Sequence, residues 1–111
     1  MKTRILICNP NDEEAEFLRQ ALGEEHVLDT SETGAECLEL LPRFAPDVVL
    51  LDADRVDGEG YETCRRIRSG PLGDFTRVIL LGTPGDAAAR VAGYAAGADD
   101  WLDRPFDPEE T

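Results

Sequence analysis

Pro46-Asp47-Val48-Val49-Leu50-Leu51-Asp52-Ala53-Asp54 is the segment from which the architecture of this chain is inferred. Its centre holds four consecutive apolar residues, two of them β-branched, which is typical of a strand buried on both faces of a parallel sheet. Asp52 follows where this strand ends. Ligands of open α/β sheets bind beyond the carboxyl ends of the strands, so this carboxylate is placed for chemistry. A helix-capping or loop role for Asp52 fits the segment equally well.

Buried strands and amphipathic helices alternate on both sides of this segment. Apolar runs predict strands at residues 4–9, 47–52 and 77–82. Residues 26–30 are short and mixed in character, which is consistent with a strand near the edge of the sheet, and residues 100–103 would form a fifth strand. Apolar residues at helical spacing predict helices from Asn11 or Asp12 to Gly23 and at residues 33–44, 59–69 and 86–96. Pro42 should end or bend the second helix. The alternation predicts one α/β domain over residues 1–111, with a doubly wound five-stranded parallel sheet.

The last residues of the chain predict the start of another helix. Asp107 is a suitable cap, Pro108 suits the first helical position, and Glu109 and Glu110 suit the first turn. The chain ends at Thr111. We therefore expect the last helix to be missing or truncated, and the chain to be a segment of a longer protein.

The composition excludes several classes of partner. Asp and Glu number 24 against 11 Lys and Arg, which gives a formal net charge of −13. This charge repels phosphate backbones and anionic membranes, so we expect no direct binding to nucleic acid or membrane. No apolar run approaches the roughly 18 residues of a membrane span, and the N-terminus is not a signal peptide. We expect a cytoplasmic protein whose three cysteines, which show no C-x-x-C spacing, are small core residues.

Four unusual residues lie at the carboxyl ends of different predicted strands: Asn9, Asp52, Gly82 and Arg104. A parallel sheet brings these ends to the same edge, so the four residues should approach one another. This convergence predicts a functional site. The chain contains no glycine-rich dinucleotide fingerprint or P-loop, and its single histidine provides no Ser-His-Asp set.

Several motifs together resemble the receiver domain of bacterial two-component response regulators. They are the first strand with the polar residues after it, the central segment at residues 46–52, Gly60-Tyr61-Glu62-Thr63-Cys64-Arg65-Arg66-Ile67-Arg68, and Gly97-Ala98-Asp99-Asp100-Trp101-Leu102-Asp103-Arg104-Pro105-Phe106. The match covers essentially the whole chain and keeps the spacing between the motifs. It implies a flavodoxin-like strand order 2-1-3-4-5, a role in phosphorelay signalling, and no enzymatic activity beyond self-phosphorylation.

The resemblance implies that Asp52 is the phosphoacceptor, which takes a phosphoryl group from a sensor histidine kinase with the help of Mg²⁺, a lysine and a hydroxyl group. This sequence has Arg104 at the lysine position and Gly82 at the hydroxyl position, with Thr83 one residue late. Arg104 could hold a phosphoryl group or form a standing ion pair with Asp52. Trp101 stands at the aromatic switch position, or is a partly exposed aromatic residue packed on the last helix.

The metal site of the family is also altered, because Asn9-Pro10 replaces an acidic pair. A carboxylate about 4 Å from a divalent ion supplies roughly 8 kcal/mol of gross Coulomb energy at an effective dielectric constant near 20. Asn9 offers only a neutral carbonyl. We therefore expect weak or absent Mg²⁺ binding at Asp52 and Asn9, unless Asp12 or Asp54 substitutes.

Two hypotheses place the chain in two-component signalling. The favoured one is a pseudo-receiver, a protein-interaction module that works without phosphorylation. The alternative is a conventional receiver phosphorylated at Asp52. Both imply a sensor kinase or another signalling protein as partner and an output domain C-terminal to this segment, and both leave homodimerisation open. The resemblance also implies a cis Arg104-Pro105 bond.

A third hypothesis comes from a different class of protein. The run Asp52-Ala53-Asp54-Arg55-Val56 fits the D-x-D-x-[T/V] pattern of aspartate-nucleophile phosphohydrolases, with Asp54 as general acid. That class carries the motif on its first strand and a lysine downstream. Here the motif follows the third predicted strand and the only lysine is Lys2, which disfavours this hypothesis.

Overall fold

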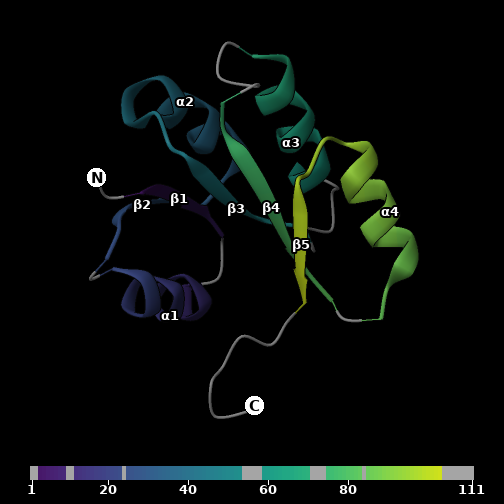
Figure 1. The fold of residues 1–111 in the computed structure, drawn as a ribbon, viewed down its shortest axis with the longest axis horizontal. Helices are drawn as coiled ribbons and strands as arrows, with labels where there is room; N and C mark the ends of the chain where they lie inside the picture. The colour runs from purple at the N-terminus through teal and green to yellow at the C-terminus, as the bar shows by residue number, and fades with distance from the viewer. Residues whose placement is uncertain are drawn as a thin grey trace.

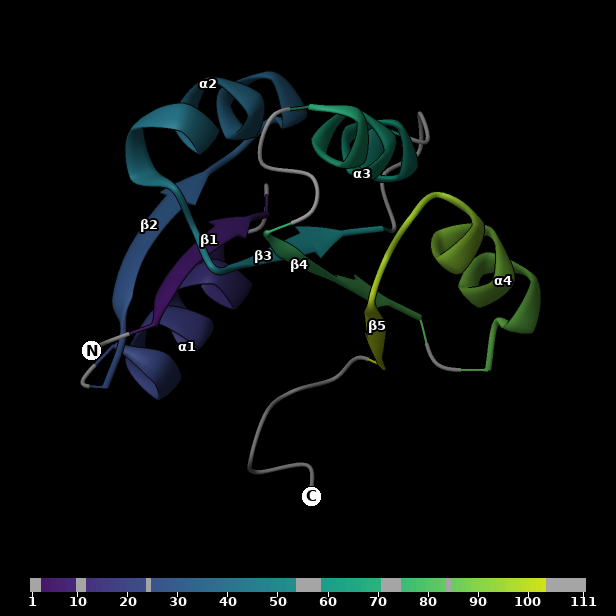
Figure 2. The same ribbon diagram turned by 45° about the horizontal axis from the view of Figure 1, so that its top comes forward.

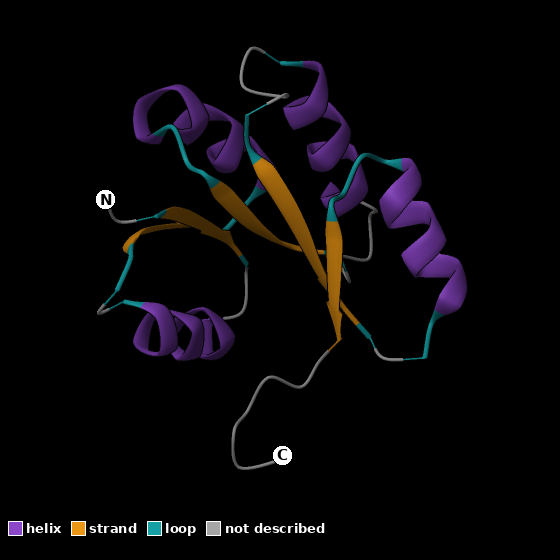
Figure 3. Cartoon of the chain, in the orientation of Figure 1, coloured by secondary structure: helices purple, strands orange, loops and turns teal. Residues whose placement is uncertain are grey.

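The structure is a computed structural model that describes residues 3–9, 12–23, 25–53, 59–70, 75–83 and 85–103. In this part of the chain, strands and helices alternate from the first element to the last (Figures 1 and 3). The strands are β1 (Arg4–Cys8), β2 (Val27–Ser31), β3 (Val48–Asp52), β4 (Arg77–Gly82) and β5 (Asp100–Asp103). The helices are α1 (Asp12–Leu22), α2 (Gly34–Phe44), α3 (Glu59–Ser69) and α4 (Ala87–Ala95).

The described strands form one parallel sheet with the order β2-β1-β3-β4-β5. This confirms the predicted flavodoxin-like order. The central strand β3 pairs with β1 on one side, where Val49 lies opposite Leu6, and with β4 on the other, where Val49 lies opposite Val78. All three residues are completely buried, as the uninterrupted apolar run of β3 predicts.

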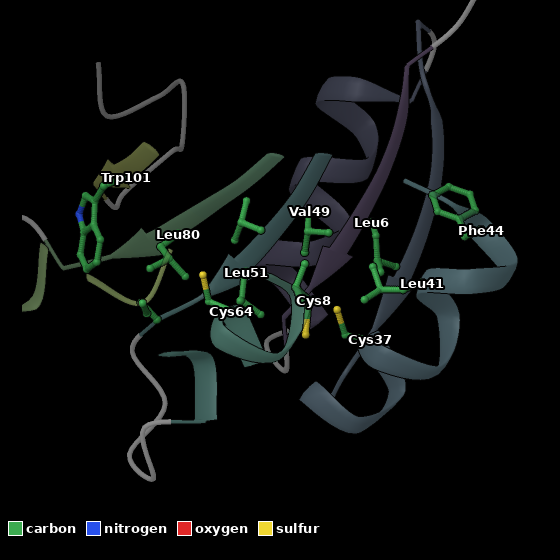
Figure 4. Packing of buried hydrophobic residues seen from close by; sticks show 14 residues of the cluster. Leu6, Cys8, Cys37, Leu41, Phe44, Val49, Leu51, Cys64, Leu80 and Trp101 are labelled. Carbon is green, nitrogen blue, oxygen red and sulfur yellow. The ribbon is translucent and has the colours of Figure 1, made fainter. Parts of the chain in front are cut away.

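Helices cover both faces of the sheet. Figure 2 shows α1 on one side and α2, α3 and α4 on the other. The two faces carry separate groups of buried side chains, because alternate residues of a strand point in opposite directions. The α1 face buries Ile5, Ile7, Leu18, Leu50 and Leu81. The opposite face has Leu6, Val49, Leu51, Leu80 and Trp101 among its buried residues (Figure 4).

Helix α2 ends at Phe44, as predicted, with Pro42 inside its last turn. The helix continues through this exposed proline to Phe44 and ends at Ala45, which has the left-handed conformation with φ 49° and ψ 62°. Pro42 lies in the last turn with its ring toward solvent, so it removes one backbone hydrogen bond without breaking the packing. Thr33 is the cap of this helix, and its side chain accepts a hydrogen bond from the Glu36 amide (3.1 Å).

The other element boundaries agree with the prediction to within two residues at each end, and those of α3, β4 and β5 agree fully. Strand β2 lies at an edge of the sheet, one residue later in the sequence than predicted. Residues 107–111, where the sequence predicts the start of a last helix, lie outside the described residues, as does the Arg104-Pro105 bond. None of the described helices has the length and apolar character that crossing a bilayer requires.

The three cysteines are free and buried, as predicted. The Cys8 thiol donates a hydrogen bond to the Thr33 carbonyl oxygen (3.5 Å), and Figure 4 shows the Cys8 and Cys37 sulfur atoms pointing toward one another. The hydrogen bond with Cys8, followed by burial, raises the pKa of the Cys37 thiol far above its ordinary value. Burial also raises the pKa of Cys64. The thiols of Cys37 and Cys64 therefore remain protonated at neutral pH.

Candidate functional site

The carboxyl ends of β1, β3 and β4 bring three predicted site residues to one edge of the sheet. Asn9 directly follows β1, and its amide donates a hydrogen bond to the Ser31 carbonyl oxygen (3.0 Å). Asp52 and Gly82 are the last residues of the adjacent strands β3 and β4. Asn9 is 2% exposed and Asp52 is 7% exposed. The edge therefore presents a buried carboxylate beside a buried amide.

The backbone around Asp52 is fixed by its neighbours. The amide of Ala53 donates to the Leu81 carbonyl oxygen (2.9 Å), so the pairing with β4 continues past Asp52. Gly60, in the first turn of α3, packs directly on this backbone. A Cβ atom at residue 60 would lie 2.3 Å from the Asp52 carbonyl oxygen, which no side chain tolerates. Glycine here lets α3 begin against the end of β3.

Asn9 is held by a residue that the sequence analysis did not single out. Its side-chain amide donates a hydrogen bond to Oε1 of Glu14, in the first turn of α1. The only sequence signal is the spacing of five residues from the end of a strand into a helix. Glu14 brings a carboxylate next to the position where the family has its acidic pair.

The indole ring of Trp101 fills the space beside Gly82. A Cβ atom at residue 82 would lie 2.1 Å from Cζ2 of Trp101 and 2.6 Å from Cη2. Gly93 of α4 contacts the ring on another side, where a Cβ atom would lie 3.2 Å from both Cε3 and Cζ3. Trp101 is 8% exposed, so the interpretation as a partly exposed aromatic residue is wrong. Two glycines make the room into which the ring inserts.

The polar edge of the same ring is anchored by a hydrogen bond. Nε1 of Trp101 donates to Oδ1 of Asp103 (2.8 Å), two residues later on β5. Asp103 also pairs with Arg90 of α4 (3.3 Å). Because both charged side chains are more than two-fifths exposed, this ion pair adds little stability on its own. Its effect is to orient the carboxylate that holds the indole.

The segment before β5 is fixed to α3 by one arginine. Nε of Arg68 donates to the Gly97 carbonyl oxygen (2.6 Å) and Nη1 donates to the Thr76 carbonyl oxygen (2.5 Å). Nη2 pairs with Asp99, whose carboxylate also accepts from the Val78 amide (2.9 Å). These contacts set the position of β5, and with it the position of Trp101.

The remaining predicted site residues are not all described. Thr83 is exposed and follows β4, and Asp12 begins α1, but the side chain of Asp12 is outside the described part. Arg104 and Asp54 also lie outside the described residues, so their expected roles stay predictions. Within the described residues, no three His, Cys, Asp or Glu side chains gather closely enough to hold a metal ion.

Comparisons with known proteins agree on one family. The response regulator receiver domain family matches residues 5–111. The chain is 36% identical over 111 residues to response regulator MprA of Mycobacterium sp. (strain KMS), which covers 99% of this chain and 47% of that protein. A similar protein from Mycobacterium ulcerans (strain Agy99) is 35% identical over the same length. The chain thus spans about half the length of the curated relatives it matches.

Solved structures show the same similarity. A putative response regulator from Chloroflexus aurantiacus J-10-fl superposes with a TM-score of 0.89 at 32% identity, covering 99% of this chain and 91% of that one. The BeF3-activated receiver domain of DrrB, from Thermotoga maritima, gives a TM-score of 0.82 at 32% identity with the same coverage.

Proposed function

The chain belongs to the response regulator receiver domain family, and we propose that within this family it is a pseudo-receiver. In this proposal it is a regulatory module that binds other proteins without being switched by phosphorylation. Asp52 keeps the phosphoacceptor position, while the groups that would couple it to a conformational change are replaced.

The observation that carries this proposal is the position of Trp101 against Gly82. A conventional receiver needs a hydroxyl-bearing side chain at residue 82 that can turn toward the phosphoryl group, and room in which the aromatic side chain can move. Here the indole already occupies the space that such a side chain would take, and Asp103 holds its N–H group. The α4–β5 region is therefore packed in one arrangement, which supports an output that does not depend on phosphorylation.

The donor atoms beside Asp52 support the same proposal. Mg²⁺ is normally held by one or two carboxylates together with water molecules. The described donors at the strand ends are the Asp52 carboxylate and the neutral Asn9 amide, which is turned toward Glu14. This set fits a weak magnesium site. When bound, the ion would screen the charge of an approaching phosphate, and Asp52 and Asn9 would be its ligands from this chain.

A specific observation favours the alternative, a conventional receiver phosphorylated at Asp52. The carboxylate is retained at the carboxyl end of β3, at the edge of the sheet where ligands bind. The DrrB receiver domain, 32% identical to this chain, is recorded in a BeF3-activated state. In this alternative, Asp52 is the nucleophile that attacks the phosphorus atom of a phosphodonor.

The longer relatives extend the proposal to the whole protein. Because this chain covers 47% of the length of MprA, we propose that an output domain follows it and that a sensor histidine kinase or another signalling protein contacts it. The net charge of −13 disfavours direct contact of this segment with nucleic acid and favours a basic protein surface as partner.

Intact-protein mass spectrometry after incubation with acetyl phosphate and MgCl₂ tests the proposal, with Asp52→Asn as the matched variant. A pseudo-receiver gains no phosphoryl adduct under conditions that label the DrrB receiver domain. An adduct that disappears in Asp52→Asn would establish the conventional alternative instead.

Tryptophan fluorescence gives a second test, because Trp101 is the single tryptophan of the chain. Beryllofluoride with Mg²⁺ imitates a bound phosphoryl group. If Trp101 is held as proposed, the emission maximum stays unchanged when this mixture is added. A saturable shift of the emission maximum that is absent in Asp52→Asn would show that the ring moves on activation, contrary to the proposal.

A further inference from the structure

A separate hollow lies next to the candidate site, where β1 and β2 end and α1 and α2 begin. Its volume is about 220 Å³, and it is lined by Asn9, Ala15, Thr30, Ser31, Glu32 and Glu36. It shares Asn9 with the strand-end site, but Asp52, Gly82 and Trp101 do not line it. The lining is mostly polar, with hydroxyl groups from β2, a carboxylate from α2, and the amide and carboxylate of the residues that directly follow β1 and β2.

Ser31 provides the first indication of a ligand. This last residue of β2 is 3% exposed, and its hydroxyl has no hydrogen-bond partner in the part of the chain that the structure describes. A buried hydroxyl without a partner lowers stability, because it has lost its hydrogen bonds to water. A hydrogen-bonding group bound in the hollow would recover that loss.

The charge of the hollow decides which kind of group this is. Glu32 and Glu36 line it, and Glu14 lies behind Asn9 through the hydrogen bond to the amide. No basic side chain is among its described lining residues. The start of α2 contributes roughly half a positive charge, which is small against the two carboxylates of the lining. The hollow is therefore electronegative and rich in hydrogen-bond acceptors.

We propose that this hollow binds an organic cation, a guanidinium or ammonium group whose N–H bonds point to Ser31 and Glu36. Such a group combines positive charge with several donors, which matches hydroxyl, carboxylate and amide oxygens. A metal ion fits less well, because no group of three or more metal-ligating side chains occurs among the described residues. The hollow is also far larger than one ion needs. The cation is either a free amine or the side chain of a basic residue of a partner protein.

Nuclear magnetic resonance titration of the ¹⁵N-labelled chain tests this site. The probes are agmatine, N-acetyl-L-arginine methylamide, and a neutral alkylurea of similar length. The signals followed are the Asn9 side-chain amide and the Ser31 and Glu36 backbone amides. The two cationic probes should shift these signals saturably, and the alkylurea should not. Tighter binding of agmatine indicates a free amine, and tighter binding of the blocked arginine indicates a protein side chain.

Matched variants separate this site from general attraction to an acidic protein. Glu36→Gln removes one charge from the hollow, and Glu39→Gln removes one charge from an exposed position of the same helix outside it. Binding should weaken at least fivefold in Glu36→Gln and stay within twofold in Glu39→Gln. Equal weakening in the two variants would overturn the proposal, as would equal shifts with the alkylurea or no saturation by any probe.

Ser31→Ala distinguishes a ligand site from a structural hydroxyl. Because this hydroxyl has no partner among the described residues, its removal should leave the melting temperature of the free protein unchanged or higher. The same variant should weaken agmatine binding at least threefold. A lower melting temperature with unchanged binding would mean that Ser31 serves the fold alone, against the proposal.

Discussion

Trp101 occupies the space that a side chain at residue 82 would need: a Cβ atom on Gly82 would lie 2.1 Å from Cζ2 of the indole. The two residues lie on the adjacent strands β4 and β5. Gly93 of α4 packs against another side of the indole ring. One aromatic side chain thus joins two strands and a helix at the edge of the sheet that carries Asp52.

Gly82→Ala should destabilise the protein by about 1–3 kcal/mol, because the added methyl group overpacks the site. Combining it with Trp101→Leu, which shortens the side chain, should cost less than the sum of the two single changes. Urea unfolding of the four proteins in this cycle measures the coupling, which we expect to exceed about 0.5 kcal/mol. Additive free energies would mean that the cost of Gly82→Ala does not come from contact with the Trp101 ring.

Asn9→Asp restores a carboxylate at the metal position, but it places that carboxylate against Glu14. The single variant should therefore lose stability through like-charge repulsion, and adding Glu14→Gln should recover it. In the double variant, Mg²⁺ affinity measured by calorimetric titration should rise at least tenfold, because a second charge joins Asp52. Glu14→Gln alone is the control and should leave the Mg²⁺ affinity near that of the unchanged chain.

Arg68→Lys should destabilise the protein by about 1–3 kcal/mol, because one ammonium group cannot replace three divergent hydrogen bonds to Gly97, Thr76 and Asp99. Arg66→Lys is the matched control on the same helix. Arg66 pairs only with Glu62 in the described contacts, and both side chains are more than half exposed, so we expect less than about 0.5 kcal/mol. Thermal unfolding of the two variants makes the comparison, and equal losses would contradict the role assigned to Arg68.

The stability of the protein should fall above about pH 8.5, the ordinary pKa of a thiol in an unfolded chain. The pKa of Cys37 is raised in the folded state, so the folded protein keeps a proton that the unfolded chain releases. The contribution of Cys37 to the free energy of unfolding is therefore fully present below this pH, and it declines by about 1.4 kcal/mol per pH unit above it.

Urea unfolding at pH 7.5 and pH 9.5 measures this decline. Cys37→Ala is the control, because it removes this thiol and leaves Cys64, whose pKa is also raised, in place. The variant should lose less stability between the two pH values than the unchanged chain. Identical losses would show that other groups cause the decline.

The central strands β1, β3 and β4 were predictable because each contains a short apolar run, which needs no information from elsewhere in the chain. The order of the strands came from the resemblance to receiver domains. The meeting of Asn9, Asp52 and Gly82 was predictable because it follows from parallel strands alone. The end of α2 at Phe44 was also predicted, and Pro42 two residues earlier marks the last turn.

The contacts of Trp101 and Asn9 were not predictable. The sequence shows Gly82, Gly93 and Trp101 as separate residues, and only the packing of α4 on β4 and β5 brings them together. The hydrogen bond from Asn9 to Glu14 depends on how α1 is placed after β1. Both are properties of the tertiary structure, which local propensities do not contain.

The outer strands of the sheet, β2 and β5, each leave one side of their backbone without a partner among the described strands. Such edges invite strand-by-strand joining of separate molecules, which leads to aggregates. Acidic side chains stand on both strands, with Asp29 on β2 and Asp100 on β5. A second molecule that docked its edge there would bring like charges together. The acidity of this chain thus also disfavours edge-to-edge pairing of these strands between molecules, and this effect weakens in acid, where the carboxylates are neutralised.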